Sequence, residues 1–244
     1  MSPARHFGAA LAVGALAAAA AATAASSPAP TVVVDPGHDL RANPATEPIG
    51  PGSSVRKVKD GGGTRGVVTG IREADLVLDV SLRLRRLLRD AGVQVVMTRT
   101  RTARVSMGNV ARARIANRAG ASLFLRVHAD GHTEQSVRGS HTLAPALRRG
   151  WTDDVYSASR RAARLVQAEL VRASRFPDRG ITERSDITGF NWADVPAILV
   201  EMGFMTNPTE DRALGGPAVR QRVAHGLCRG VLRVLRRAPS ACGV

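Results

Sequence analysis

The chain has 244 residues and a formal net charge of +15, from 35 basic and 20 acidic side chains. This length suits one α/β domain with a full core, and no internal repeat points to a repeat array. Aromatic residues make up only 3% of the chain. Few rings are therefore available to stack on bases, and we expect no nucleic-acid partner. Two explanations of the charge stay open: GC-rich codons, which favour arginine, or attraction to a polyanion.

The first segment has the pattern of a secretory signal peptide. Arg5 and His6 precede an alanine-rich apolar stretch at 7–22, and Ala22-Thr23-Ala24 offers a small-x-small cleavage site. The alternative is a membrane anchor, which needs about 20 strongly apolar residues. We expect residues 1–25 to be removed, residues 26–30 to form a short flexible leader, and the mature chain to have no stable membrane insertion.

The remaining chain alternates strand and helix patterns. Short β-branched runs predict buried strands, and apolar residues at helical spacing predict amphipathic helices. Residues 39–70, rich in Gly, Pro and charge, predict a long irregular excursion. The strands are expected at 31–35, 93–97, 122–128, 140–143 and 197–201, and the helices at 73–89, 110–118, 155–173 and 219–235.

This alternation predicts the α/β class: a single domain at 31–237, with a mainly parallel twisted sheet and helices on both faces. Residues 238–244 would form a C-terminal tail. Within the end of the chain lie the only two cysteines, Cys228 and Cys242. A helix followed by an extended return could bring them together, so we expect a disulfide, with two free thiols as the alternative.

Polar side chains follow three of the apolar runs. His38 comes just after the first strand, His128 ends the strand at 122–128, and Glu201 ends the strand at 197–201. Because ligands bind outside the carboxyl ends of strands in open α/β sheets, these groups are expected to meet there. Two imidazoles and a carboxylate are a zinc ligand set. The residues alone leave the third ligand open among five acids: Asp35, Asp39, Glu73, Asp130 and Glu201.

Several segments resemble, in order, those of zinc-dependent N-acetylmuramoyl-L-alanine amidases, the type 3 catalytic domain. The resemblance runs from residue 31 to about 237, and its closest block is 196–207, which contains Glu201. The chain departs from the family pattern at Asp39-Leu40-Arg41, where glycines and an acid are usual, and at Asp130, where Asn is common. The similar segments are 32–38, 72–76, 98–99, 112–117, 122–130 and 196–207.

The resemblance implies one Zn²⁺ per chain, held by His38, Glu73 and His128 at the carboxyl ends of the strands. Glu201 would be the catalytic carboxylate. Arg184, just before the last strand, is a candidate for binding a peptide carboxylate of the substrate. We also expect activity without an activator protein, since only residues 39–70 are long enough to cover the cleft.

The function implied is hydrolysis of the amide between N-acetylmuramic acid and L-alanine in peptidoglycan or muropeptides, in wall remodelling, division or recycling. The protein would be a monomer, secreted to the wall or periplasmic space, with anionic wall polymers as candidate partners. Two alternatives stay open: a zinc peptidase acting within the stem peptide, and a non-catalytic wall-binding protein.

Overall fold

The computed structural model describes residue 1 and residues 28–243, so residues 2–25 of the expected signal segment lie outside the described part. Its centre is a six-stranded sheet in the order β4-β1-β5-β8-β6-β7. Neighbouring strands are parallel except β6 and β8, which are antiparallel. The predicted single-domain, mainly parallel fold is therefore confirmed. The strands are β1 Thr31–Pro36, β4 Gln94–Met97, β5 Leu123–Asp130, β6 Ser140–Pro145, β7 Asp178–Arg184 and β8 Ala197–Phe204.

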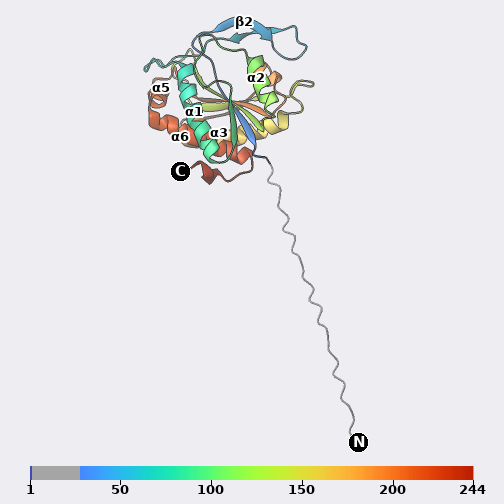
Figure 1. Ribbon diagram of the computed structural model, residues 1–244. Coiled ribbons are helices and arrows are strands. Elements are labelled where there is room, and N and C mark those ends of the chain that lie inside the picture. The colour runs from blue at the N-terminus through green and yellow to red at the C-terminus, as the bar shows by residue number, and fades with distance from the viewer. Residues whose placement is uncertain (2–27, 244) are drawn as a thin grey trace.

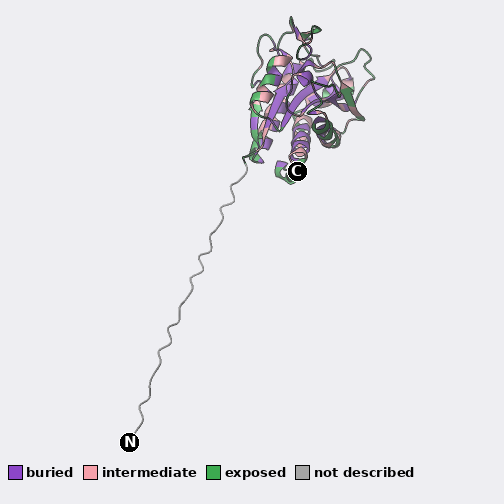
Figure 2. Ribbon diagram, turned by 90° about the vertical axis from the view of Figure 1, so that its right-hand side faces the viewer, coloured by how far each residue is buried: buried purple, intermediate pink, exposed green. Residues whose placement is uncertain are grey.

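Helices cover both faces of this sheet (Figure 1). Helices α1 (Glu73–Asp90), α3 (Tyr156–Ser174) and α6 (Pro217–Val234) pack on one face, where Val32 and Val34 of β1 point. Helices α2 (Asn109–Arg118) and α4 (Thr188–Asn191) cover the opposite face, where Val33 points. Alternate strand residues thus enter two separate cores, and the central strands β1, β5 and β8 are almost wholly buried between the helical layers (Figure 2).

The chain path creates a topological switch point between β1 and β5. From β1 the chain passes through α1 to β4 on one side of β1, and then through α2 to β5 on its other side. Because α1 and α2 lie on opposite faces, their connections part at the carboxyl ends of β1 and β5. That crevice is the usual ligand site of an open α/β sheet.

The excursion at 39–70 is not wholly irregular, and the prediction is wrong in this respect. Strands β2 (Asn43–Pro48) and β3 (Arg56–Asp60) pair antiparallel as a separate two-stranded sheet, at the top of Figure 1. Pro44 and Pro48 obscured β2 in the sequence, because proline cannot donate to a ladder and is confined to edge positions. Both strands of a two-stranded sheet are edges, so β2 tolerates them.

Three further elements were not predicted: β7, α4 and α5 (Pro208–Gly215). Strand β7 is an edge strand with polar, exposed residues and lacks the apolar run of a buried strand. Helix α5 has a readable start, since the Asn207 side chain accepts hydrogen bonds from the N–H groups of Thr209 and Glu210, with proline at the first turn. The sequence therefore carried a signal for α5 but little for β7.

The described C-terminal residues fold back on α6. The return is a short 3₁₀ helix, η1 (Pro239–Cys242), and not the extended segment expected from the sequence. It buries Cys242, which is bonded to Cys228 with 5.9 Å between the two Cα atoms. His225 adds a 2.7 Å contact from its Nδ1 to the carbonyl oxygen of Cys242. The cysteine pair expected from the sequence is thus joined in the structure. Across residues 28–243, no helix has the length and apolar character needed to cross a membrane.

Candidate active site

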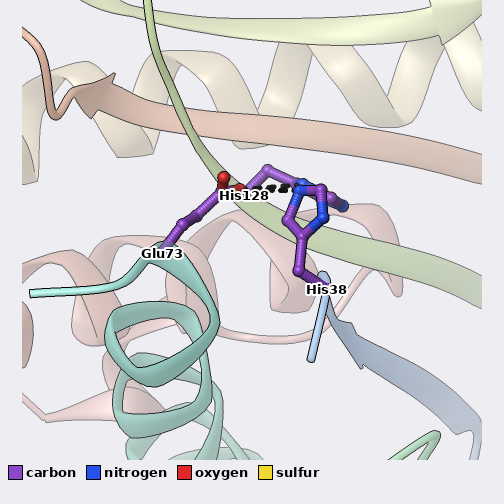
Figure 3. Close-up of side chains that lie close together, drawn as sticks. All are labelled: His38, Glu73 and His128. Carbon is purple, nitrogen blue, oxygen red and sulfur yellow. Dashed lines mark hydrogen bonds and ion pairs between the residues drawn. The ribbon is translucent and has the colours of Figure 1, made fainter. Parts of the chain in front are cut away.

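Three side chains converge at the switch point. His38 follows β1, His128 lies in β5, and Glu73 is the first residue of α1; Figure 3 shows all three pointing toward one another. Glu73 Oε1 lies 3.3 Å from Nε2 of His38 and 3.0 Å from Nδ1 of His128. One donor atom from each residue falls within 4.8 Å of the other two. Of the five acids left open by the sequence, Glu73 is the one that meets both imidazoles.

His38 sits on a tightly held loop. Its φ of 55° is in the left-handed region that few non-glycine residues adopt. The N–H of Gly37 donates to the carbonyl oxygen of Val127 in the next strand at 2.9 Å. A Cβ at position 37 would collide with the His128 ring, so only glycine lets the two imidazoles approach. Strain at such a position is typical of functional loops held by their surroundings.

A buried polar network supports the same loop from below. The Asp35 carboxylate accepts hydrogen bonds from Thr98 Oγ1, Arg112 Nη1 and Arg126 Nε. Burial alone would raise the pKa of Asp35, but the two guanidinium groups outweigh it and hold that pKa well below its usual value. Arg99 donates to the carbonyl oxygens of Pro36 and Gly37, among others.

This network gives a structural role to two of the acids, and to two of the segments, that the sequence analysis singled out. Asp35 was a candidate third ligand, yet both of its oxygens serve the loop. Asp39, another candidate, accepts from the Ala103 N–H and from Arg112 Nη2. Thr98, Arg99 and Arg112, which belong to the segments at 98–99 and 112–117, therefore hold the loop that carries His38.

Glu73 is fixed at both of its oxygens. Oε2 accepts from the N–H of Thr64 at 2.9 Å, and Oε1 accepts from the N–H of Ala129 at 3.2 Å. Burial opposes ionisation, but hydrogen bonds with His128 and His38 outweigh it and lower the pKa of Glu73. A position at the start of α1 also favours a negative charge. Glu73 is therefore an ionised, preoriented carboxylate.

Asp60 is a site residue that sequence reasoning missed. Its Oδ1 lies 2.6 Å from Nδ1 of His38 and also accepts from the N–H of Gly62. Burial opposes protonation of His38, but Asp60 and Glu73 outweigh it and raise the pKa of this imidazole to about 9. Asp60 ends β3, in a polar segment expected to be irregular, so no pattern in the sequence marked it.

Glu201 lies beside the histidines in the sheet. Its Cα pairs with that of His128 in the parallel register between β5 and β8. Among the described residues its Oε2 is buried without a hydrogen-bond partner. Burial, with added repulsion from Glu73 and Asp130, raises the pKa of Glu201 well above the ordinary value. A carboxylate whose pKa is raised takes up a proton more readily than an ordinary one, which suits a general base.

His141 approaches Glu201 from the other side. In the antiparallel register of β6 and β8 these two residues are partners, and His141 Nε2 lies 3.2 Å from Asp130 Oδ2. Asp130, His141 and Glu201 also place donor atoms within 4.8 Å of one another. Asp130, the position at which the chain departs from the amidase pattern by having Asp in place of Asn, therefore brings an extra carboxylate to the edge of the site.

The residues present fit a zinc ion. The set at His38, Glu73 and His128 has two nitrogen donors and one oxygen donor, the composition of catalytic zinc sites. His128 Nε2 is buried and has no hydrogen-bond partner within the described part of the chain, which is costly unless a further group engages it. A cavity of about 460 Å³ opens beside the three side chains and Glu201, giving a substrate access to them.

Arg184 lies apart from this cluster. Its Nε and Nη2 both contact the Asp186 carboxylate at 2.7 Å, and Asp186 also accepts from Lys57 of β3. Arg184 is absent from the described lining of the cavity beside the histidines. The structure thus gives its guanidinium an internal partner, and its role in substrate binding stays a prediction.

Comparisons with known proteins show which family the chain belongs to. The family model for N-acetylmuramoyl-L-alanine amidase matches residues 32–233. The amidase Rv3717 of Mycobacterium tuberculosis is 32% identical over 207 residues, covering 82% of this chain and 84% of that protein. AmiA of Escherichia coli is 27% identical over 232 residues, covering 74% and 80%.

A solved structure is similar over most of the chain. The crystal structure of the amidase Ami1 from Mycobacterium smegmatis matches with a TM-score of 0.76 and 30% identity, covering 86% of this chain and 99% of that one. The family match spans most of the sequence and includes every residue of the cluster. The chain therefore belongs to the N-acetylmuramoyl-L-alanine amidase family of hydrolytic enzymes.

Proposed function

We propose that this protein is an exported, zinc-dependent amidase that cleaves the bond between N-acetylmuramic acid and L-alanine in peptidoglycan. The observation that carries the proposal is the meeting of His38, Glu73 and His128 with Glu201 at the switch point of the sheet. Family membership supports the same activity. Wall remodelling, division or recycling is the setting we propose, with the protein acting as a monomer outside the cytoplasm.

His38, Glu73 and His128 would hold one zinc ion. When bound, zinc supplies Lewis-acid chemistry: it polarises a carbonyl group and makes water more acidic. Asp60 keeps a proton of His38 on Nδ1, so the neutral imidazole has its lone pair on Nε2, the ring nitrogen that lies near Glu73, and that lone pair is available to the metal. The Thr64 and Ala129 amides hold the Glu73 carboxylate in place, so little reorganisation accompanies binding.

Glu201 is the proton carrier in this proposal. It accepts a proton from the water that attacks the lactyl carbonyl carbon and then gives it to the amine nitrogen of L-alanine as the C–N bond breaks. Its raised pKa, caused first by burial, brings proton uptake and release closer to neutral pH. Glu201 and His128 are neighbours in the sheet, which supports a role for Glu201 beside the metal ligands.

Digestion of purified sacculi tests the proposal, with products read by mass. We expect release of peptides with N-terminal L-alanine, loss of release with a chelator, and recovery on adding zinc. The Glu201→Gln variant is the control: peptides found with this variant were already free in the sacculus preparation and were not released by the enzyme. Stem-peptide fragments left on the glycan would instead indicate a peptidase, and wall binding without any release would indicate a binding protein.

A further inference from the structure

Besides the cavity at the histidine cluster, the structure has a groove between the β2–β3 hairpin and helix α2. It has a volume of about 700 Å³ and is enclosed by the β2–β3 hairpin, helix α2 and the ring of Trp192. Helix α2 covers the sheet face opposite α1, α3 and α6. The groove is thus distinct from the cavity that His38, Glu73 and His128 line.

The groove is strongly positive. Four basic side chains line it, and in the described structure none of them has an ion pair: Arg56, Lys59, Arg114 and Arg118. Its one acid, Glu47, has both carboxylate oxygens engaged by the N–H groups of Asn109 and Val110. The groove therefore offers unpaired positive charge to a ligand and no free carboxylate.

Its wall also includes a fixed aromatic ring. The indole Nε1 of Trp192 donates to the carbonyl oxygen of Pro48 at 3.0 Å, which anchors the ring to the hairpin. The guanidinium of Arg114 lies 5.5 Å from the ring centroid, with Ile115 nearby on the same wall. An anchored ring flanked by cations suits a ligand that carries both apolar ring faces and acid groups.

Lys59 connects the groove to the candidate active site. Besides lining the groove, it lines a cavity of about 320 Å³ that also contacts His38, His128 and Glu201. A long polymer cut at the histidine cluster can therefore extend past Lys59 into the groove. Peptidoglycan has the required chemistry, because stem peptides that bear carboxylates branch from the N-acetylmuramic acid rings of its glycan strand.

We propose that this groove, between the hairpin and α2, binds a part of the peptidoglycan strand beyond the bond that is cut: a glycan segment and the carboxylates of its stem peptide. The proposal rests on the proposed function for the identity of the polymer. The proposal explains why four cations without ion pairs and a fixed ring line one groove. The general excess of arginine in the chain does not by itself account for this grouping.

The test compares matched pairs of arginines in the full mature chain. Arg114 and Arg118 are both exposed on α2 and four residues apart, so Arg114→Gln/Arg118→Gln removes mutual repulsion and should not weaken the fold. The control pair, Arg86→Gln/Arg164→Gln, removes the same charge from exposed positions on α1 and α3, across the sheet. Both are made in a Glu201→Gln background, so that binding is measured without cleavage.

Binding is measured by cosedimentation with sacculi stripped of phosphate polymers. We expect the groove pair to lower affinity by about fivefold or more, as the loss of two exposed charge contacts allows, and the control pair by less than about twofold. Converting the wall carboxylates to neutral amides should abolish the difference between the pairs. Equal losses of affinity for the two pairs would overturn the proposal. A difference between the pairs that is seen only on unstripped walls would also overturn it, because it would assign the groove to a phosphate polymer.

Activity separates this inference from the proposed function. With Glu201 intact, the groove pair should lose activity on sacculi but keep it, within about twofold, on a disaccharide with a single stem peptide, which has no further strand to fill the groove. Equal loss on both substrates would count against the groove. An intact protein that cleaves neither substrate, yet binds stripped walls through Arg114 and Arg118, would refute the proposed function and support the groove.

Discussion

Asp60 Oδ1 and His38 Nδ1 are 2.6 Å apart, and this contact ties the β2–β3 hairpin to the candidate metal site. The pKa of Asp60 is lowered to about 2: burial opposes this, but the His38 imidazole outweighs it. Asp60 is therefore an ionised acceptor, and Nδ1 of His38 must donate. A carboxylate behind a metal-binding imidazole fixes its tautomer and raises its basicity.

The same stretch of chain supports a second ligand. After Asp60, the backbone turns through Gly62 and Gly63, and the N–H of Thr64 reaches Glu73 Oε2. Gly63 has a φ of 70°, and a Cβ there would press on His38 and Glu73. We infer that residues 60–64 are part of the support of the site, so that trimming them would damage the site besides opening it.

The first prediction concerns Asp60. Replacing it in Asp60→Asn removes the charge that orients His38, and zinc affinity should fall about 10- to 100-fold, the usual cost of losing such a partner. Zinc binding to the metal-free protein, followed by competition with a chromophoric chelator, measures this. Asp186→Asn is the matched control, because Asp186 holds Lys57 of the same strand but touches no candidate ligand. Equal affinities for wild type and Asp60→Asn would contradict the assignment.

The second prediction separates Glu201 from Glu73. Glu201→Gln should keep the fold and the metal while turnover falls at least about 100-fold, the usual contribution of general acid–base catalysis. Glu73→Gln should lower zinc affinity, because the amide weakens one of three donors, and excess zinc should restore part of its activity. Zinc content and turnover are measured on the same samples. Metal loss in Glu201→Gln with retention in Glu73→Gln would reverse the two roles.

The apolar runs of the sequence predicted most of the architecture. Strands β1, β5 and β8 are buried on both faces, and their β-branched runs end at the groups that meet in the site. The amphipathic pattern of α1 located its buried face, and Glu73 at its start could be selected by the family resemblance. Periodic burial leaves a clear trace in the sequence, so these elements were found within a few residues of their observed bounds.

The rest depended on contacts that leave no local pattern. In the described part of the chain, strand β3 pairs only with β2 and buries only Asp60, whose carboxylate meets His38, 22 positions away in the sequence. Strand β7 is a polar edge, and the direction of β6 against β8, which sets His141 opposite Glu201, follows from tertiary packing. Sequence periodicity reports burial and not which polar groups meet, so Asp60 and His141 required the structure.

The third prediction concerns the disulfide. Cys228 and Cys242 close a loop with a sequence separation of 14. A cross-link over a loop of this size restricts the unfolded chain and is worth about 3 kcal/mol. Cys228→Ala/Cys242→Ser should lower the free energy of unfolding by about that amount in urea melts while zinc affinity and turnover stay unchanged, since α6 and η1 contribute no residue to the cluster of His38, Glu73 and His128. Identical midpoints for wild type and variant would show that the bond adds nothing.

The last prediction is that zinc affinity rises with pH. In the metal-free protein Asp60 and Glu73 overcome the effect of burial and raise the pKa of His38 to about 9, whereas burial lowers the pKa of His128. His38 is thus protonated at neutral pH, and its charge stabilises the metal-free fold until pH rises through about 9. Zinc needs the neutral imidazole, so one proton must leave, and apparent affinity should rise about tenfold per pH unit between pH 6.5 and 8.5. Chelator competition, corrected for the chelator's own titration, measures the slope.

Asp60→Asn should lower the pKa of His38. The zinc affinity of this variant should therefore depend less on pH, and its loss of affinity relative to wild type should be largest at pH 8.5. A flat wild-type profile would mean that His38 is already neutral when zinc binds.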